Sequence, residues 1–487
     1  MNIQSNPPAV AAVTESEKNA IIAGVLSAML LAALDQMIVA PAMPTIGALL
    51  GHADYLPWIV TAYLLTATAT APLYGKFSDV FGRRPVIAAA IAIFLTGSLI
   101  SAAAPSMLIL IFGRAVQGLG GGGLFALAQT VIGDLVPPRE RARYSAWISA
   151  TWAIASIAGP LLGGYFAEHL HWSLIFWINF PIGLIALLVL NEPLKKLNSP
   201  TRRHSIDIAA ALLLIAATSL LMLALNWGGH AYAWRSAPIG ALLGGSLALW
   251  LLFGVRLFTA KEPLISLKAL GNPIVLTAAF ASFMAQFAFV GASIFLPVFF
   301  QQRLGLAADQ SGFALLGMLV GTVVGASTAG RLTARLTHYK RIAVVGAVVA
   351  TASLVGLAMI ADTRSLLIIE LLTSMAGVGV GALFPILSVS VQNAVGRSDL
   401  GVATGVNIFL RSLGGAIGVA VLGAIALGYG LPLAREGMGT AAASVAAQSV
   451  DVYRALFFTA AAAMAVALAL LLVMREKPLE GGADRQA

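Results

Sequence analysis

Fourteen long apolar runs constrain the fold of this chain more than any other feature of its sequence. A helix needs about 20 mostly apolar residues to cross the hydrocarbon core of a membrane. Only 10% of the 487 residues are charged, whereas a soluble domain carries about a quarter, so lipid must surround most of the chain. The predicted spans lie near residues 20–43, 56–75, 85–104, 107–133, 144–167, 173–191, 206–226, 236–256, 273–301, 312–333, 341–360, 365–389, 401–426 and 454–474.

The positions of Lys and Arg predict the orientation of these helices. With the N-terminus in the cytoplasm, cytoplasmic segments hold 22 of the 29 basic residues, outer segments hold five, and Arg114 and Arg411 fall inside helices. Basic residues collect on the cytoplasmic side of membrane proteins, and an even number of spans then places both termini there. This bias explains the net charge of +9 without nucleic acid as a partner. We expect a multi-pass protein of the plasma (inner) membrane, with residues 1–18 and 475–487 as cytoplasmic tails.

Two sequence patterns recur after nearly the same interval. GKFSD at residues 75–79 has a counterpart, GRLTA, at residues 330–334, which is 255 positions later. GLGGGGLF at residues 118–125 has a counterpart, GVGVGALF, at residues 377–384, which is 259 positions later. The repeat predicts two related six-helix halves, residues 19–195 and 270–474, around a central site, an arrangement typical of transporters. Residues 206–256 are left over as a two-helix insert.

The segment GKFSDVFGRRPV, residues 75–86, crosses the loop between the second and third predicted helices. Gly75 and Gly82 permit close helix contact and a tight turn. Asp79 can pair locally with Arg83 and Arg84 or lie against a helix N-terminus. The alternative is an ordinary basic cytoplasmic loop that happens to contain glycine.

Two polar residues share one face of the fourth predicted helix. Arg114 and Gln117 are three positions apart, so their side chains lie on the same side. An Arg within a membrane helix is costly and is a functional candidate by default. In the alternative interpretation, Arg114 extends to the outer interface, where its charge meets water.

The fifth predicted helix contains Gly159, Pro160, Gly163 and Gly164. Pro removes a backbone hydrogen bond and kinks a helix, and glycines let a neighbouring helix approach closely. The simpler explanation is an ordinary packing face of small residues.

The first predicted helix has an acid inside its apolar run. Asp35 is followed by Pro41 and Pro44, which we expect to break the helix beyond it. The alternative is an Asp that water reaches in an outer vestibule.

Together these motifs resemble those of the major facilitator superfamily, over nearly the whole chain. The 75–86 loop is similar to the family pattern Gly-x-Leu-a-Asp-r-x-Gly-r-k, with Phe77 and Val80 as departures. In that family the loop latches the two halves together in the outward-open state. Its counterpart in the second half has Ala334 in place of Asp. The resemblance thus implies an all-α membrane protein of the major facilitator fold, with an acidic latch in the first half only.

The remaining motifs imply further roles by the same resemblance. The Arg of helix four takes part in proton coupling in the family. The helix-five motif, in which Ala155 replaces the first Gly, is found mainly in exporters. The stretch LDQMIVAPAMP at residues 34–44 is similar to the pattern Leu-Asp-x-Thr-Ile-Val-Asn-Val-Ala-Leu-Pro of the fourteen-helix drug:proton antiporters of the QacA/EmrB type. It departs from that pattern at Met37, Ala40 and Pro41.

Few other polar residues lie within the predicted spans. Glu370 is about two turns from the outer end of helix twelve, and Gln286 is near the middle of helix nine. Asn407 and Arg411 are four positions apart and share a face of helix thirteen. By the resemblance, helices one, four, nine and twelve line the central cavity. We therefore assign proton coupling to Asp35, Arg114 and Glu370, and the substrate cavity to Gln117, Gln286, Asn407 and Arg411. In the alternative interpretation, Glu370 caps the outer end of its helix near Arg364.

These assignments predict export driven by a proton gradient, with no cofactor. Asp35 beside Arg114 is placed to gain or lose a proton as the cavity hydrates and dries, and a proton there competes with a cationic or hydrogen-bonding substrate. We expect a monomer that exports lipophilic compounds, cations among them. One alternative is an exporter of a single native metabolite, lipid or amino acid with the same fold, and another is a non-transporting membrane subunit. The six His residues form no metal-binding pattern, so neither an enzyme nor a metal site is predicted, and the sequence names no periplasmic adaptor.

Overall fold

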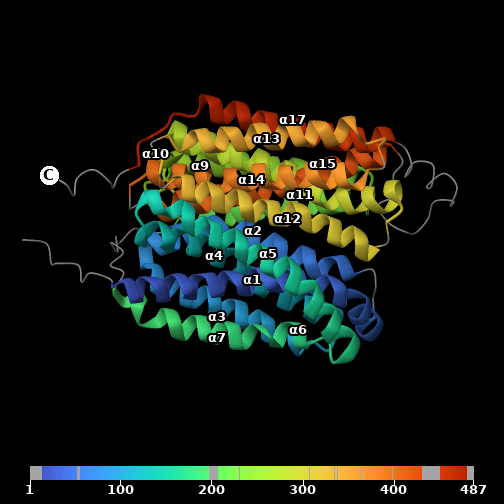
Figure 1. The fold of residues 1–487 in the computed structure, drawn as a ribbon. Helices are drawn as coiled ribbons and strands as arrows, with labels where there is room; N and C mark the ends of the chain where they lie inside the picture. The colour runs from blue at the N-terminus through green and yellow to red at the C-terminus, as the bar shows by residue number, and fades with distance from the viewer. Residues whose placement is uncertain are drawn as a thin grey trace, which may run out of the picture.

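The computed structural model of the chain describes residues 14–51, 55–196, 207–229, 231–306, 308–333, 335–336, 338–363, 365–396, 399–429 and 450–479. Figure 1 shows a bundle of long helices that run along one common direction. Within the described residues, strand-type pairing is limited to an isolated bridge between Gly228 and Tyr232. The prediction of an all-α protein is therefore confirmed for the described part of the chain.

The helices before residue 197 pack around an apolar core of their own. They are α1 (Glu15–Leu50), α2 (Leu56–Phe81), α3 (Arg83–Ala102), α4 (Met107–Leu135), α5 (Pro138–His169), α6 (Leu174–Trp177), α7 (Asn179–Asn191) and the 3-10 helix η2 (Pro193–Lys196). The largest cluster of buried side chains in this part extends from Ile21 to Leu194. The sixth predicted span is divided between α6 and α7.

The helices after residue 272 pack around a second core. They are α11 (Pro273–Leu304), α12 (Ala308–Thr333), α13 (Lys340–Met359), α14 (Leu366–Ala394), α15 (Leu400–Gly428) and α17 (Val450–Val473). Their buried cluster extends from Val275 to Leu479. Figure 1 shows this part, in yellow to red, beside the part formed by α1–α7. The two parts meet where α2 contacts α15 and where α5 contacts α12.

Two helices, α8 (Ile208–Trp227) and α9 (Ala237–Thr259), lie between these parts in the sequence and are followed by the short α10 (Leu267–Leu270). α8 packs on α2 and α15, and Thr61 Oγ1 of α2 donates a hydrogen bond to Asn226 Oδ1 of α8 at 3.0 Å. α9 packs on α8 and leaves large apolar side chains exposed, such as Leu251 at 64% and Phe258 at 78%. The outer surface of this pair is therefore suited to lipid.

Thirteen helices of the described residues are long and apolar enough to cross a membrane. They correspond to thirteen of the fourteen predicted spans. The remaining predicted span corresponds to α2, which contains four threonines between residues 61 and 70. Two of them satisfy their hydroxyls on backbone carbonyls, as Thr66 does on Ala115 and Thr70 on Thr66. A helix with such satisfied hydroxyls is compatible with a membrane interior, and a count of fourteen remains a proposal.

The prediction that prolines break the first helix is wrong. α1 continues through Pro41 and Pro44 to Leu50. This region of α1 packs on α5, where Gly163 lies against the Ile38 carbonyl. In a membrane helix, neighbouring helices and local adjustments offset the hydrogen bonds that Pro removes.

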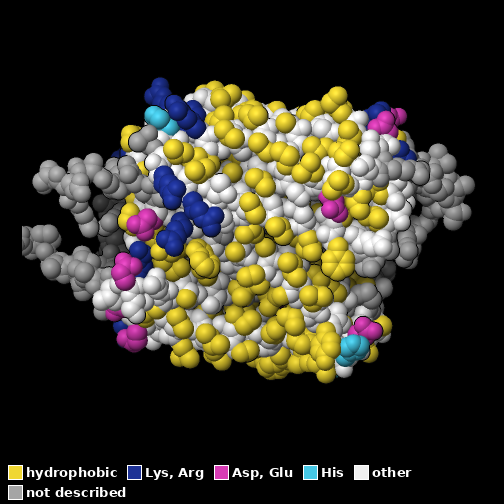
Figure 2. Space-filling view, viewed as in Figure 1, with side chains coloured by type: hydrophobic (Ala, Val, Ile, Leu, Met, Phe, Trp, Pro, Cys, Tyr) yellow, Lys and Arg dark blue, Asp and Glu magenta, His cyan; other side chains and the backbone are white. Residues whose placement is uncertain are grey.

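Side chains on the surface follow the predicted membrane pattern. Figure 2 shows apolar side chains across the middle of the bundle, with Lys and Arg gathered toward the end where α1 begins and α17 ends. Lipid would cover the apolar band, and the basic end is the one expected to face the cytoplasm.

Candidate functional site

A buried ion pair joins α1 to α4 inside the first part of the bundle. Arg114 Nη1 lies 2.5 Å from Asp35 Oδ2. The Asp35 side chain is 0% exposed and the Arg114 side chain 1%. Arg114 therefore does not extend to water at the outer interface, and the predicted pairing of these two residues is present in the structure.

A backbone carbonyl and three side chains provide the other contacts of the Arg114 guanidinium. Its Nε donates to the Ile59 carbonyl at 3.1 Å, and its Nη1 donates to Gln117 Oε1 at 2.7 Å. The guanidinium carbon stands 4.4 Å from the ring centre of Tyr63 and 5.7 Å from that of Phe176. Aromatic faces stabilise a desolvated cation, so they offset part of the cost of burying this charge.

Ser98 and Asn179 belong to this site and were not predicted from the sequence. Asn179 Nδ2 donates to Asp35 Oδ1 at 2.9 Å and to Ser98 Oγ at 3.0 Å. Gln117 Nε2 donates to the same two oxygens, at 2.5 and 2.8 Å. We call Asp35, Ser98, Arg114, Gln117 and Asn179 the α1–α4 polar cluster. A polar Asn within the sixth apolar run was the signal that would have identified Asn179.

Gln117, which the sequence assigned to the substrate cavity, is a member of this cluster. Its side chain is fully buried and turned toward Asp35, among α1, α3, α4 and α7. All five side chains of the cluster are buried, so solvent reaches them only if these helices rearrange. Buried ionised groups are stable only when paired and hydrogen-bonded, and Arg114, Gln117 and Asn179 supply Asp35 with such partners.

The predicted residues of the second part lie apart from this cluster. Arg411 Nε donates to Gln286 Oε1 at 3.1 Å, and its guanidinium stands 3.7 Å from the ring centre of Phe384. Among the described residues, no carboxylate pairs with Arg411. Asn407 is 3% exposed, and its Oδ1 accepts no hydrogen bond from the described residues. Such an orphaned buried acceptor is costly and invites a donor from a bound molecule or from water.

Glu370 is half-buried on α14, in the second part of the bundle. It makes no hydrogen bond or ion pair with another described residue, and it is not joined to Asp35 or Arg114. Arg364, the suggested partner in the capping interpretation, lies outside the described residues.

Residues 75–86 connect the two parts of the bundle, and the prediction that they form a loop is wrong: they belong to the end of α2 and the start of α3, with only Gly82 between the two helices. Asp79 Oδ1 accepts from the Gly401 amide at 3.2 Å, and Asp79 Oδ2 accepts from the Val402 amide at 3.0 Å. These amides belong to the first turn of α15, where the helix dipole favours a negative charge. The expected contact of Asp79 with a helix N-terminus is thus formed, and it crosses between the two parts.

Arg83 holds Asp79 in this position. Its Nη1 donates to Asp79 Oδ1 at 2.6 Å, and its Nε donates to Asp134 Oδ2 at 2.7 Å. Asp134, near the end of α4, was not predicted, because one acid at a helix end carries no signal of a partner 51 residues away. Arg84 instead donates to Asn191 Oδ1 at 2.7 Å, within the first part.

Glycines make the approach of α2 to α15 possible. A Cβ added at Gly75 would collide with the Gly401 carbonyl oxygen. Gly82, between α2 and α3, has φ of 89°, which side chains other than that of glycine rarely adopt. We call the contact formed by Gly75, Asp79, Arg83, Asp134 and the first turn of α15 the α2–α15 latch.

The glycines of α5 bring it against α1 next to Asp35. A Cβ added at Gly159 would lie 2.5 Å from Met37 Cβ, and one at Gly163 would collide with the Ile38 carbonyl oxygen. A Cβ at Gly164 would meet nothing within 4 Å. α5 continues through Pro160, and it is also the helix that contacts α12 in the second part.

Comparison with known proteins places this geometry in a family. Residues 25–419 match the family model described as Major Facilitator Superfamily. The chain is 33% identical over 411 residues to multidrug transporter protein MdtP of Bacillus subtilis (strain 168), covering 84% of this chain and 76% of the relative. It is 31% identical over 433 residues to multidrug resistance protein 3 of the same organism, covering 88% and 84%. The human organic anion transporter MFSD10 (TETRAN) has a similar fold, with a TM-score of 0.65 at 18% identity over 96% of this chain and 100% of that one.

Proposed function

The chain belongs to the major facilitator superfamily, and from this premise we propose that it is a proton-coupled antiporter that exports lipophilic drugs, cations among them. Two relatives bear names that describe multidrug transport or resistance, which supports this substrate class. In this proposal, residues 19–195 and 270–474 are the two halves that alternate access, and residues 206–256 are an insert. Fourteen spans place both termini in the cytoplasm.

The observation that carries the proposal is the buried pair of Asp35 and Arg114. A carboxylate beside a guanidinium favours its ionised form, and loss of that partner or drying of the site favours the protonated form. Binding of a proton to Asp35 removes the charge that holds Arg114 Nη1 and the two amides of the cluster. Because breaking one side of a buried ion pair costs about 3–5 kcal/mol, protonation is coupled to a rearrangement of α1 and α4.

Packing provides a route from this rearrangement to the opposite half. α1 is held against α5 at Gly159 and Gly163, and α5 contacts α12. A shift of α1 therefore displaces α5 and changes the α5–α12 interface between the two halves. The engaged α2–α15 latch supports the view that the structure represents the state closed at the cytoplasmic side.

The test uses Asp35→Asn, which removes the titrating group with little change in volume. In proteoliposomes loaded with a lipophilic dye, we expect loss of dye efflux and of the accompanying proton influx. Because Arg114 is left buried without its anion, the double variant D35N/R114Q is measured beside it, and both must retain the melting temperature needed for reconstitution. Proton-driven efflux at the normal rate in both folded variants would contradict the assignment of proton coupling to Asp35. Glu370 would then be the next candidate for the proton-binding group.

One observation favours a second candidate function, export of a single native metabolite. Arg411 and Asn407 are four positions apart on α15 and share a face. The Arg411 guanidinium suits a carboxylate, and the orphaned Asn407 Oδ1 suits an N–H or O–H donor on the same compound. Competition by such a compound against dye efflux, lost in Arg411→Gln, would support this second candidate.

A further inference from the structure

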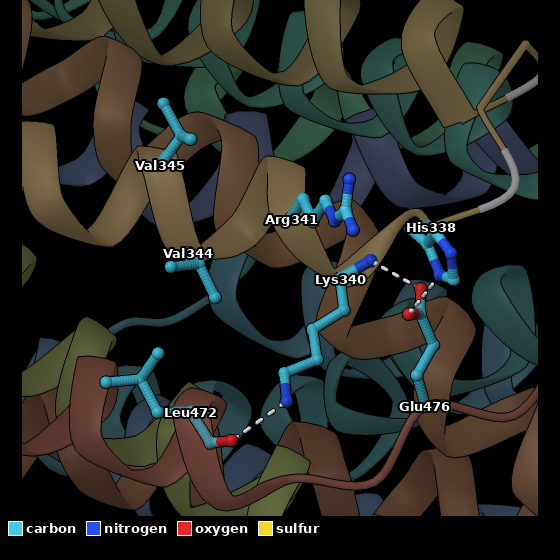
Figure 3. Close-up of a pocket in the computed structure, with 7 residues that line it drawn as sticks. All are labelled: His338, Lys340, Arg341, Val344, Val345, Leu472 and Glu476. Atoms are coloured by element: carbon cyan, nitrogen blue, oxygen red, sulfur yellow. Dashed lines mark hydrogen bonds and ion pairs between the residues drawn. The ribbon is translucent and has the colours of Figure 1, made fainter.

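A cavity of about 490 Å³ lies at the surface between the start of α13 and the end of α17. Its lining residues, shown in Figure 3, are His338, Lys340, Arg341, Val344, Val345, Leu472 and Glu476. Pockets of 300–1,000 Å³ are the usual size for small ligands. We call it the α13–α17 cavity, and no residue assigned to transport lines it.

The cavity lies at the boundary of the predicted membrane region. Lys340 is the first residue of one candidate span, and Val473 is the last residue of another. Next to the charged side chains, apolar side chains are exposed: Val345 at 61%, Leu472 at 59% and Val473 at 77%. A site with one charged end and one apolar wall at this depth matches the boundary between lipid headgroups and acyl chains.

Most polar groups of the cavity already have partners within the protein. Lys340 Nζ donates to the carbonyls of Leu472 and Met474 at 2.9 and 2.6 Å. Glu476 accepts from the Lys340 amide at 2.9 Å and lies 3.2 Å from His338 Nδ1. These contacts close the end of α17 onto the start of α13.

Arg341 is the exception. In Figure 3 the dashed lines join Lys340 and His338 to Glu476 and Lys340 to Leu472, and none reaches the guanidinium of Arg341. The Arg341 side chain is exposed and makes no hydrogen bond or ion pair with another described residue. Lys340 and Arg341 are both basic, and the one acid of the cavity, Glu476, already pairs with His338 and the Lys340 amide. The cavity therefore has an excess of positive charge, and the N–H groups of the Arg341 guanidinium are available to a ligand.

We propose that the α13–α17 cavity binds the phosphate headgroup of an anionic phospholipid, with Arg341 as its main ligand. Guanidinium groups bind phosphate through two parallel hydrogen bonds, and basic pockets between membrane helices on the cytoplasmic side bind anionic headgroups. The acyl chains extend over Val345, Leu472 and Val473. The lipid comes from the cytoplasmic leaflet, an assignment that rests on the orientation given in the proposed function.

The test measures lipid binding to the purified, delipidated full-length chain by native mass spectrometry. We expect phosphatidylglycerol to bind more tightly than phosphatidylcholine, and Arg341→Ala to lower its affinity about tenfold, the loss of one charge-assisted contact. Arg331→Ala, which removes another exposed Arg, from the last turn of α12, is the matched control and should leave the affinity unchanged. Glu476→Gln keeps an acceptor for Lys340 but removes the competing charge, so it should raise the affinity.

Three outcomes would overturn the proposal. The first is equal affinity for phosphatidylglycerol and phosphatidylcholine, and the second is equal affinity of wild type and Arg341→Ala for phosphatidylglycerol. The third is saturation of the cavity by glycerol phosphate at the same concentrations as the lipid, which would indicate a site for soluble anions. Because Arg341 makes no intramolecular hydrogen bond, its variant should keep the wild-type melting temperature in detergent. Asp35→Asn should bind phosphatidylglycerol normally, so failure of the transport proposal is separable from failure of this one.

Discussion

The α2–α15 latch makes a quantitative prediction about opening at the cytoplasmic side. Asp79→Asn keeps the size of the side chain but removes its charge and leaves one acceptor oxygen in place of two. Of the two hydrogen bonds from the amides of Gly401 and Val402, one is therefore lost and the other loses its charge-assisted character. A hydrogen bond to a charged group contributes about 1.5–3 kcal/mol, against about 0.5–1.5 for a neutral one. At the low end of the range for charged groups, two charged bonds of about 1.5 kcal/mol each are replaced by one neutral bond of about 1 kcal/mol. The loss is about 2 kcal/mol, which is roughly a thirtyfold shift of the latch toward its open form.

The assay exploits the absence of Cys from the chain. Val402 is 3% exposed and contacts Asp79 through its backbone amide, so Val402→Cys reports opening of the latch through its reaction with a membrane-impermeant maleimide. We expect labelling to be slow in this background and roughly thirtyfold faster when Asp79→Asn is added, by the equilibrium argument above. Substrate binding should persist, because the latch is distant from the residues assigned to the cavity.

A neighbouring acid supplies the control. Asp399 directly precedes α15, but its side chain makes no capping hydrogen bond. Asp399→Asn should therefore leave the labelling rate unchanged, which separates the specific contact of Asp79 from a general loss of negative charge at this helix end. Equal labelling rates of Val402→Cys with and without Asp79→Asn would refute the latch. Loss of substrate binding together with transport would mean that residues 75–86 have a purely structural role.

Other variants test the remaining contacts. Asn179→Ala removes a donor to both Asp35 and Ser98, and we expect it to lower the free energy of unfolding by about 1–2 kcal/mol, measured as a decrease in melting temperature in detergent; an unchanged value would mean that Asn179 does not support the cluster. Gly163→Ala should abolish dye efflux because its methyl group meets the Ile38 carbonyl, whereas Gly164→Ala should retain efflux, and equal activities would exclude the tight α1–α5 contact. Glu370→Gln should weaken export of a monovalent lipophilic cation more than that of a neutral dye; equal loss indicates a structural or coupling role, and no loss indicates a merely solvated residue.

The sequence predicted the polar residues that are costly to bury, since each stands out against an apolar run. Asp35 and Arg114 were identified in this way, whereas Asp79 was identified from the glycines and arginines around it in residues 75–86. Ser98, Asp134 and Asn179 were missed because their residue types are common near helix ends or in packing faces. Their roles arise from tertiary contacts between helices far apart in the chain, which periodicity does not reveal.

Two other differences have physical causes. Gln117 was assigned to the substrate cavity, and the structure joins it by hydrogen bonds to Asp35, Ser98 and Arg114, contacts that depend on the helices packed around α4. The helix break expected at Pro41 and Pro44 is absent because local propensity is overridden by tertiary packing. In both cases the sequence identified an unusual residue, and the neighbouring helix determined its effect.

The polar cluster and the latch share one rigid element, which in the proposed mechanism connects the protonation of Asp35 to the contact between the two halves. α4 carries Arg114 in the cluster and Asp134 in the latch, 20 residues apart, which is about 30 Å along a helix. Small residues on α4 pack against the backbones of α2 and α3: a Cβ at Gly122 would meet the Ala67 carbonyl, and one at Gly120 the Ala90 carbonyl. With so little room to bend or rotate separately, α4 moves together with its neighbours when Asp35 releases Arg114. We infer that such a joint movement of α2, α3 and α4 carries Asp79 and Arg83 away from the first turn of α15, so that one helix couples the charge of Asp35 to the closure between the two halves.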